Sequence, residues 1–241
     1  MHFARSSRAW ANPVCFAAAL LAACATTPPA PAHGTGTVWG SLRLVPHAGV
    51  TMPDAGDPTY QDRRMRDTRI FDYSHPGFAV VYLDGAVRKG ERTDVAIRSN
   101  EFETRLEPGW VALAQGGTVA VYNATNEAHT VSCPSLGKVA RLAPGDTFEI
   151  PARDAGAHSL FLLDRPQVES GFFAAPGPYA VLTSDSRFEL RDLAPGRVEL
   201  HAWHPRLPPV ARPIDVTADQ LVRVDLEMGV GTSQETSDAR P

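Results

Sequence analysis

The chain has 241 residues, of which 43% are hydrophobic and 21% are charged, so it can bury a core and is not disordered throughout. Its formal charge of −4 argues against a nucleic-acid-binding protein, because such domains are usually strongly basic. The 19 glycines and 21 prolines disfavour helices and favour short strands joined by turns.

The N-terminus is typical of an export signal. Arg5 and Arg8 precede an apolar run from Val14 to Ala23, which has the length of a signal-peptide core and is too short to span a bilayer. The run ends in Leu21-Ala-Ala-Cys24, which resembles the bacterial lipobox. The resemblance implies that Cys24 is lipidated and becomes the first residue of the mature protein. The alternatives are a plain secretory signal with an incidental cysteine and a buried hydrophobic helix.

The residues after Cys24 predict where the protein resides. Residues 24–36 are rich in proline and glycine, which is typical of a tether between a lipid and a folded domain. We expect a lipid-anchored protein of the cell envelope that faces the periplasm, with the membrane as a partner through its N-terminal lipid. Ala25 follows the cysteine where Asp would favour retention in the inner membrane, so the outer membrane is favoured.

From Thr37 onward the sequence predicts an all-β protein. No window of twelve or more residues shows a helical apolar period, and short β-type runs alternate with turn residues, a spacing that favours β-sandwiches with Greek-key connections. The predicted strands are Val38–Val45, Phe78–Leu83, Trp110–Leu113, Thr118–Tyr122, Thr130–Ser132, Thr147–Ile150, His158–Leu163, Tyr179–Leu182, Arg187–Leu190, Arg197–Trp203 and Leu221–Glu227. Residues 46–76 are expected to form a long polar loop, and the tail 229–241 is expected to be disordered.

The segment from Trp110 to Val168 carries a recognisable series of strands and turns. A strand–turn–strand over 117–131 contains His129, a Pro-Gly hairpin spans 142–150, and residues 155–161 lead into a loop. This series resembles the cupredoxins. The resemblance implies a copper site built from His129 and from loop residues at positions 162, 165 and 168.

The copper ligands of that family are missing from the loop. Leu162 stands at the position of the Cys ligand, Arg165 at that of the second His, and Val168 at that of the axial Met. A blue-copper site needs two imidazoles and a thiolate, and a desolvated guanidinium repels a cation. We therefore treat these as degenerate ligand positions and expect neither copper nor another cofactor.

A second resemblance covers the chain on both sides of this segment. Residues 183–200 follow the Asp-x-x-Gly-x-Phe-x-Leu-x-x-Leu-x-Pro-Gly pattern of carboxypeptidase-regulatory-like (transthyretin-like) domains, and residues 36–42 and 79–85 resemble their first strands. The combination is similar to bacterial envelope proteins named methylamine-utilisation proteins. It implies a signal peptide (1–23), a lipidated tether (24–36), the first strands of this sandwich with a long loop (37–86), a cupredoxin-like domain (87–172), the remainder of the sandwich (173–228) and the tail (229–241).

Three residues are candidates for a rebuilt metal site. His129 and Cys133 are four residues apart, so on one strand they share a face, and His158 shares a face with Leu162 for the same reason. An imidazole–thiol–imidazole set would suit Cu(I) or Zn(II). We favour the alternative that His129 is a hydrogen-bonded histidine, Cys133 a small buried hydrophobic residue and His158 a surface or capping residue.

The sequence contains no Gly-x-Ser-x-Gly, His-Glu-x-x-His or phosphate-binding glycine motif, so we expect no enzyme. It predicts a non-catalytic envelope lipoprotein whose metal-free cupredoxin-like module serves binding or assembly, with an envelope protein or a glycan as its partner. The first alternative is a periplasmic copper- or zinc-binding or electron-transfer-associated protein that uses His129, Cys133 and His158. The second is a carbohydrate-binding module. Asn123-Ala-Thr125 predicts a turn before His129 rather than a glycosylation site.

Overall fold

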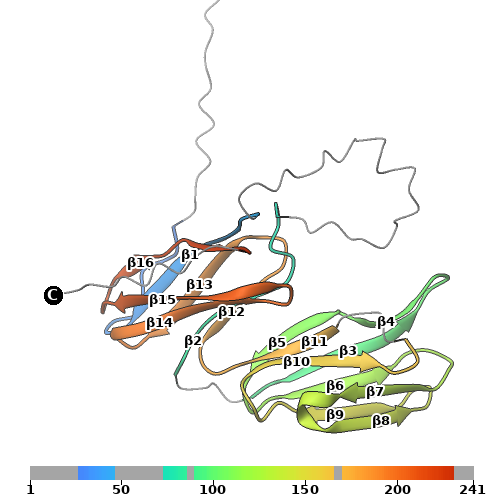
Figure 1. The fold of residues 1–241 in the computed structure, drawn as a ribbon. Helices are drawn as coiled ribbons and strands as arrows, with labels where there is room; N and C mark the ends of the chain where they lie inside the picture. Colours follow the sequence, from blue (N-terminus) through green and yellow to red (C-terminus); the bar gives the residue numbers. More distant parts are fainter. Residues whose placement is uncertain (1–26, 47–72, 86–89, 166–169, 231–241) are drawn as a thin grey trace, which may run out of the picture.

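The computed structural model describes residues 27–46, 73–85, 90–165 and 170–230 (Figure 1). Over these ranges the chain forms strands β1 to β17, a single 3-10 turn at Pro134–Leu136 and no α-helix, so the predicted all-β sandwich fold is confirmed. No helix in this part of the chain is long and apolar enough to cross a membrane. The predicted signal peptide, Cys24, residues 47–72 of the predicted polar loop, Val168 and the tail from residue 231 lie outside the described residues.

The first sandwich is built from strands near both ends of the described chain. One sheet has the strand order β13-β1-β16, with β17 also paired to β1, and the other has the order β12-β2-β14-β15. The large side chains of its core include Leu42, Phe188, Leu200 and Met228. The strands are β1 (Gly36–Leu44), β2 (Ala79–Leu83), β12 (Tyr179–Leu182), β13 (Arg187–Leu193), β14 (Gly196–His204), β15 (Leu207–Val216), β16 (Leu221–Arg223) and β17 (Leu226–Met228).

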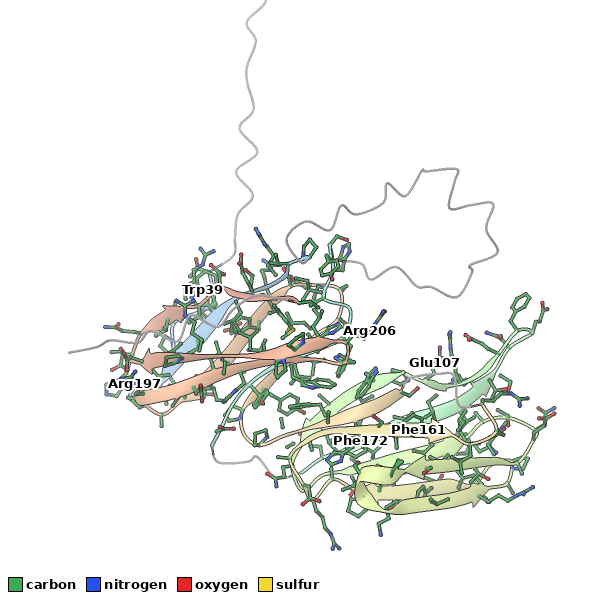
Figure 2. The ribbon with its side chains drawn as sticks, in the orientation of Figure 1. Trp39, Glu107, Phe161, Phe172, Arg197 and Arg206 are labelled. Atoms are coloured by element: carbon green, nitrogen blue, oxygen red, sulfur yellow. The ribbon has the colours of Figure 1, made fainter. Side chains whose placement is uncertain are left out.

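The second sandwich uses the strands between β2 and β12. Its sheets have the orders β5-β11-β10-β7-β8 and β4-β3-β6-β9, and Phe172 fills the space between them (Figure 2). The strands are β3 (Arg92–Ser99), β4 (Thr104–Glu107), β5 (Trp110–Ala114), β6 (Thr118–Asn123), β7 (His129–Cys133), β8 (Lys138–Leu142), β9 (Thr147–Pro151), β10 (Gly156–Leu162) and β11 (Ser170–Ala175).

The second sandwich is inserted into the first, and the two lie side by side (Figure 1). The strands that flank the insertion, β2 and β12, pair with each other, so the chain enters and leaves the second sandwich at one place. Five rings pack there, and we call this cluster the aromatic junction. Its members are Phe78, Tyr82 and Trp203 of the first sandwich and Trp110 and Phe173 of the second.

Strand β11 shows how one segment serves both parts of the molecule. Phe172 points into the core of the second sandwich, and the next residue, Phe173, points into the aromatic junction, because successive side chains of a strand face opposite sides. The predicted division between residues 172 and 173 therefore falls inside this strand.

The prediction from sequence missed strands β3, β4, β8, β11 and β15 and merged β16 with β17. Strand β15 contains Pro208, Pro209 and Pro213, which argue against a strand, but β15 lies at a sheet edge, where a residue without an N–H is tolerated. Strands β16 and β17 are separated at Asp225, whose carboxylate accepts hydrogen bonds from the backbone N–H and the hydroxyl of Ser41.

Candidate functional site

Strands β7 and β10 position the three candidate metal ligands. They pair antiparallel, with Leu162 opposite Val131. Continued by two residues, this register brings Asp164, just beyond β10, opposite His129 at the start of β7. The backbone hydrogen bond from Leu163 N to Thr130 O, at 2.9 Å, continues the pairing in that direction.

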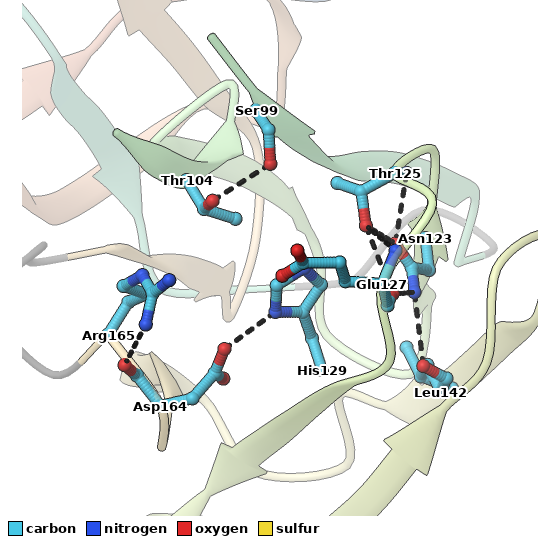
Figure 3. A network of polar contacts seen from close by, with 9 residues as sticks. All are labelled: Ser99, Thr104, Asn123, Thr125, Glu127, His129, Leu142, Asp164 and Arg165. Atoms are coloured by element: carbon cyan, nitrogen blue, oxygen red, sulfur yellow. Dashed lines mark hydrogen bonds and ion pairs between the residues drawn. The ribbon is translucent and has the colours of Figure 1, made fainter. Parts of the chain in front are cut away.

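His129 is hydrogen-bonded to Asp164. Its Nδ1 lies 2.7 Å from Asp164 Oδ2, and the imidazole is buried while the carboxylate is 37% exposed (Figure 3). Burial raises the pKa of Asp164, but the hydrogen bond with His129 and bonds from backbone N–H groups outweigh it and hold the pKa below its ordinary value. The carboxylate therefore occupies one of the two nitrogens that a metal ion would use. The other, Nε2, is buried without a hydrogen-bond partner among the described residues.

A turn held by Asn123 fixes the chain that leads to His129 (Figure 3). The buried amide group of Asn123 donates to the backbone oxygens of Glu127 and Leu142, at 2.8 and 3.0 Å. Its side-chain oxygen accepts bonds from the N–H and the hydroxyl of Thr125. All of the polar groups of this side chain are used in the turn, which agrees with the prediction of a turn at this place.

The degenerate ligand positions carry no metal donor. Leu162 is buried in the core of the second sandwich, and Arg165 turns its guanidinium back so that Nη1 donates to the backbone oxygen of Asp164 at 2.9 Å. One imidazole, already bonded to a carboxylate, does not fit a copper centre, which needs a thiolate and a second imidazole. We refer to His129, Asp164, Leu162 and Arg165 as the His129 corner.

Cys133 and His158 lie at the other end of β7. The Cys133 Sγ is 3.7 Å from the hydroxyl oxygen of Ser135, and that oxygen is 2.9 Å from Nδ1 of His158. Cys133 lies four residues along the strand from His129, which places their Cα atoms about 13 Å apart at roughly 3.3 Å per residue. The donor atoms of two ligands of one zinc or copper ion lie within about 4 Å of each other, since each metal–donor bond is about 2.0–2.3 Å long.

The hypothesis that His129, Cys133 and His158 converge on one metal is therefore wrong. Within the described ranges no group of three or more His, Cys, Asp or Glu side chains could hold a metal ion. His158 is also not a surface residue: it is 4% exposed and stacks on Phe172, with ring centroids 4.8 Å apart. A shared face of the sheet brings side chains to the same core but does not bring them close together.

Cys133 behaves as the buried hydrophobic residue of the favoured alternative. Its side chain is completely buried, and burial raises the pKa of the thiol despite opposing hydrogen bonds from Ser135 and the backbone of Leu136. Because the thiolate is the reactive form, such a thiol is a poor nucleophile and a poor metal ligand at neutral pH.

Sequence reasoning missed Asp164 and Ser135, the partners of the two buried histidines. Both follow from the antiparallel register of β7 and β10, which is set by the pair of Leu162 and Val131. Extended in one direction, this register leads to Asp164 and His129, and extended in the other, it leads to His158 and Ser135. The sequence predicted both strands, but their register, which places Asp164 opposite His129, is visible only in the structure.

No family model and no curated protein matches the chain. A solved structure described as "Novel Purple Cupredoxin from Nitrosopumilus maritimus" is similar to part of it, with 18% sequence identity and a TM-score of 0.31. The match covers 34% of this chain and 99% of that chain.

Proposed function

We propose that the protein is a non-catalytic binding or assembly element of the cell envelope, held at a membrane by a lipid on Cys24. In this proposal the second sandwich is a metal-free cupredoxin-like module, and the first is a carboxypeptidase-regulatory-like sandwich. The membrane, and an envelope protein or a glycan, are its partners.

The contact between His129 and Asp164 carries the metal-free part of the proposal. A hydrogen bond of 2.7 Å between Nδ1 and the carboxylate occupies one of the two nitrogens of the corner's one histidine. Leu162, at the position of the thiolate, is part of the hydrophobic core and donates no electron pair. A metal ion at this corner would find at most two protein ligands, His129 and Asp164, fewer than the three protein ligands that even an open zinc site uses.

The aromatic junction supports the assembly part. Trp203 contacts Phe173 and Trp110 of the other sandwich, with ring centroids 4.8 and 5.2 Å apart. Contacts of this size between large aromatic rings hold two modules in one orientation. A fixed pair of modules on a tether presents one continuous surface to a partner, which suits a scaffold better than a carrier that must open and close.

Metal loading tests the proposal. The full chain, purified in detergent, is incubated with Cu(I), Cu(II) and Zn(II) in turn, desalted and analysed for metal content and visible absorption. We expect no stoichiometric metal and no intense thiolate-to-copper absorption. The matched variants are His129→Ala and His33→Ala, the latter at an exposed histidine outside both sandwich cores.

One tightly bound equivalent that is lost in His129→Ala and retained in His33→Ala would overturn the proposal and favour the metal-handling alternative. Metal that is retained in both variants would indicate binding outside the His129 corner and would equally contradict a metal-free protein.

A further inference from the structure

A pocket of about 320 Å³ lies at the end of the second sandwich away from the His129 corner. It is formed where the 3-10 turn after β7 approaches the segment after β9. This volume is at the lower end of the range of about 300–1,000 Å³ typical of small-molecule sites. Its lining consists of Ser135, Leu136, Lys138, Pro151, Arg153 and Asp154.

Two cations line this pocket together with the carboxylate of Asp154, and neither forms an ion pair within the described part of the chain. In the described part of the chain, neither Lys138 nor Arg153 has a carboxylate within ion-pair distance, whereas Arg92, Arg105 and Arg187 each have one. Both cationic side chains are exposed and line the same concave surface. Positive charge that is concentrated in a cavity and left unpaired attracts anions, and a guanidinium can hold a carboxylate or phosphate with two parallel bonds.

Ser135 lines the same pocket, and its hydroxyl group has a fixed role. Nε2 of His158 lies 2.9 Å from the backbone oxygen of Asp154, and since a carbonyl only accepts, Nε2 carries the hydrogen. In the neutral imidazole, Nδ1 is then an acceptor, so the Ser135 hydroxyl donates to it at 2.9 Å. The oxygen of Ser135 is left with lone pairs for the pocket, where it can accept a hydrogen bond from a ligand hydroxyl.

The lining thus combines donors for an anion with acceptors for hydroxyl groups. Lys138 and Arg153 provide the charge-assisted donors, while Ser135 and the carboxylate of Asp154 provide the acceptors. A simple inorganic anion would leave both acceptors unused, and a neutral sugar would leave both cations unpaired.

We propose that this pocket binds a hydroxylated organic anion of monosaccharide size, such as a sugar acid or a sugar phosphate. Lys138 and Arg153 hold the anionic group, Ser135 and Asp154 accept bonds from the ring hydroxyls, and Leu136 contacts the apolar edge of the ring. The inference rests on the proposed binding role, and it does not depend on whether the His129 corner is free of metal.

Calorimetric titration of the full chain with four probes tests this site. The probes are D-glucuronate, D-glucose 6-phosphate, D-glucose and inorganic phosphate, so the first two distinguish a carboxylate from a phosphate ligand. We expect one or both anionic sugars to bind, and D-glucose and inorganic phosphate to bind at least tenfold more weakly.

The variants assign the roles. Lys138→Gln and Arg153→Gln should each weaken binding of the anionic sugar about tenfold, which corresponds to about 1.4 kcal/mol. Arg141→Gln is the matched control, because Arg141 is an exposed cation on the same strand, β8, outside the pocket. Ser135→Ala should weaken binding of the sugar and leave that of inorganic phosphate unchanged.

Backbone amide shifts of the unmodified protein provide a second measurement that needs no variant. On addition of the anionic sugar, the shifts should concentrate at residues 135–138 and 151–154. Absence of binding by both anionic sugars, binding of D-glucose with equal affinity, or shifts elsewhere on the molecule would each overturn the inference. Metal content is measured on the same samples, so a failure of the metal-free proposal is recorded separately from a failure of this one.

Discussion

The substitution Trp203→Ala tests whether the aromatic junction couples the two sandwiches. Trp203 is partly buried on β14, and its ring centroid lies 4.8 Å from that of Phe173, 5.2 Å from that of Trp110 and 6.4 Å from that of Phe78. Two of these three rings belong to the second sandwich. Removal of the indole therefore takes away contacts within the first sandwich and contacts between the two.

The cost follows from the size of the ring and its exposure. Replacement of a buried Phe or Trp by Ala costs about 3–5 kcal/mol. Because Trp203 keeps some exposure, we expect a loss near the lower end, about 3 kcal/mol in the free energy of unfolding. Each aromatic pair contributes about 0.5–1.5 kcal/mol beyond its buried area, and two of the three pairs lost here cross the junction.

Urea unfolding followed by far-UV circular dichroism, together with scanning calorimetry, measures both effects. The unmodified protein should unfold in one transition, since the two sandwiches share the junction. The variant should show a lower midpoint and two separable transitions. The matched control is Trp39→Ala on β1, whose ring packs against the Arg223 guanidinium at 5.2 Å and lies on the first sandwich away from the junction (Figure 2).

Trp39→Ala should cost about 1 kcal/mol and keep a single transition. If Trp203→Ala unfolded like this control, with one transition and a similar midpoint, the junction would not couple the sandwiches energetically, and the argument for a fixed two-module surface would fail.

Three further changes test other parts of the molecule. The folded-state pKa of Asp164 is below its ordinary value, so its pair with His129 contributes stability at neutral pH that is lost as the pH falls below about 4. Asp164→Asn should therefore reduce the difference in unfolding free energy between pH 7 and pH 3. An unchanged difference would refute the pairing. Asn123→Ala should lower the unfolding free energy by about 2–4 kcal/mol in urea titrations, because it leaves the backbone oxygens of Glu127 and Leu142 without their donor. Asn126→Ala, in the same turn, is the control. Cys24→Ala should abolish incorporation of labelled palmitate and move the protein from the membrane fraction to the soluble fraction of cells; retention in the membrane fraction would contradict lipid anchoring.

Local patterns in the sequence were enough to predict the class of fold and the donor chemistry of positions 162 and 165 in the His129 corner. Strand periodicity and turn residues predicted an all-β sandwich, which the structure confirms. The residues at positions 162 and 165 could be recognised as non-ligands from side-chain chemistry alone, since leucine offers no lone pair and arginine carries a positive charge. Both are local properties: periodicity depends on neighbours in the chain, and donor chemistry depends on a single side chain.

Which of these residues meet depends on how the strands pair and pack. A period of two residues shows that His129 and Cys133 share a face, but not that they lie about 13 Å apart along it. The partner of each histidine, Asp164 or Ser135, is set by the register between β7 and β10, which are joined by a long connection. The edge position that allows prolines in β15, and the insertion that brings Trp203 against Phe173, likewise depend on contacts between residues distant in the chain. Local pattern carries no information on these contacts, because they form only when separate strands pair and pack.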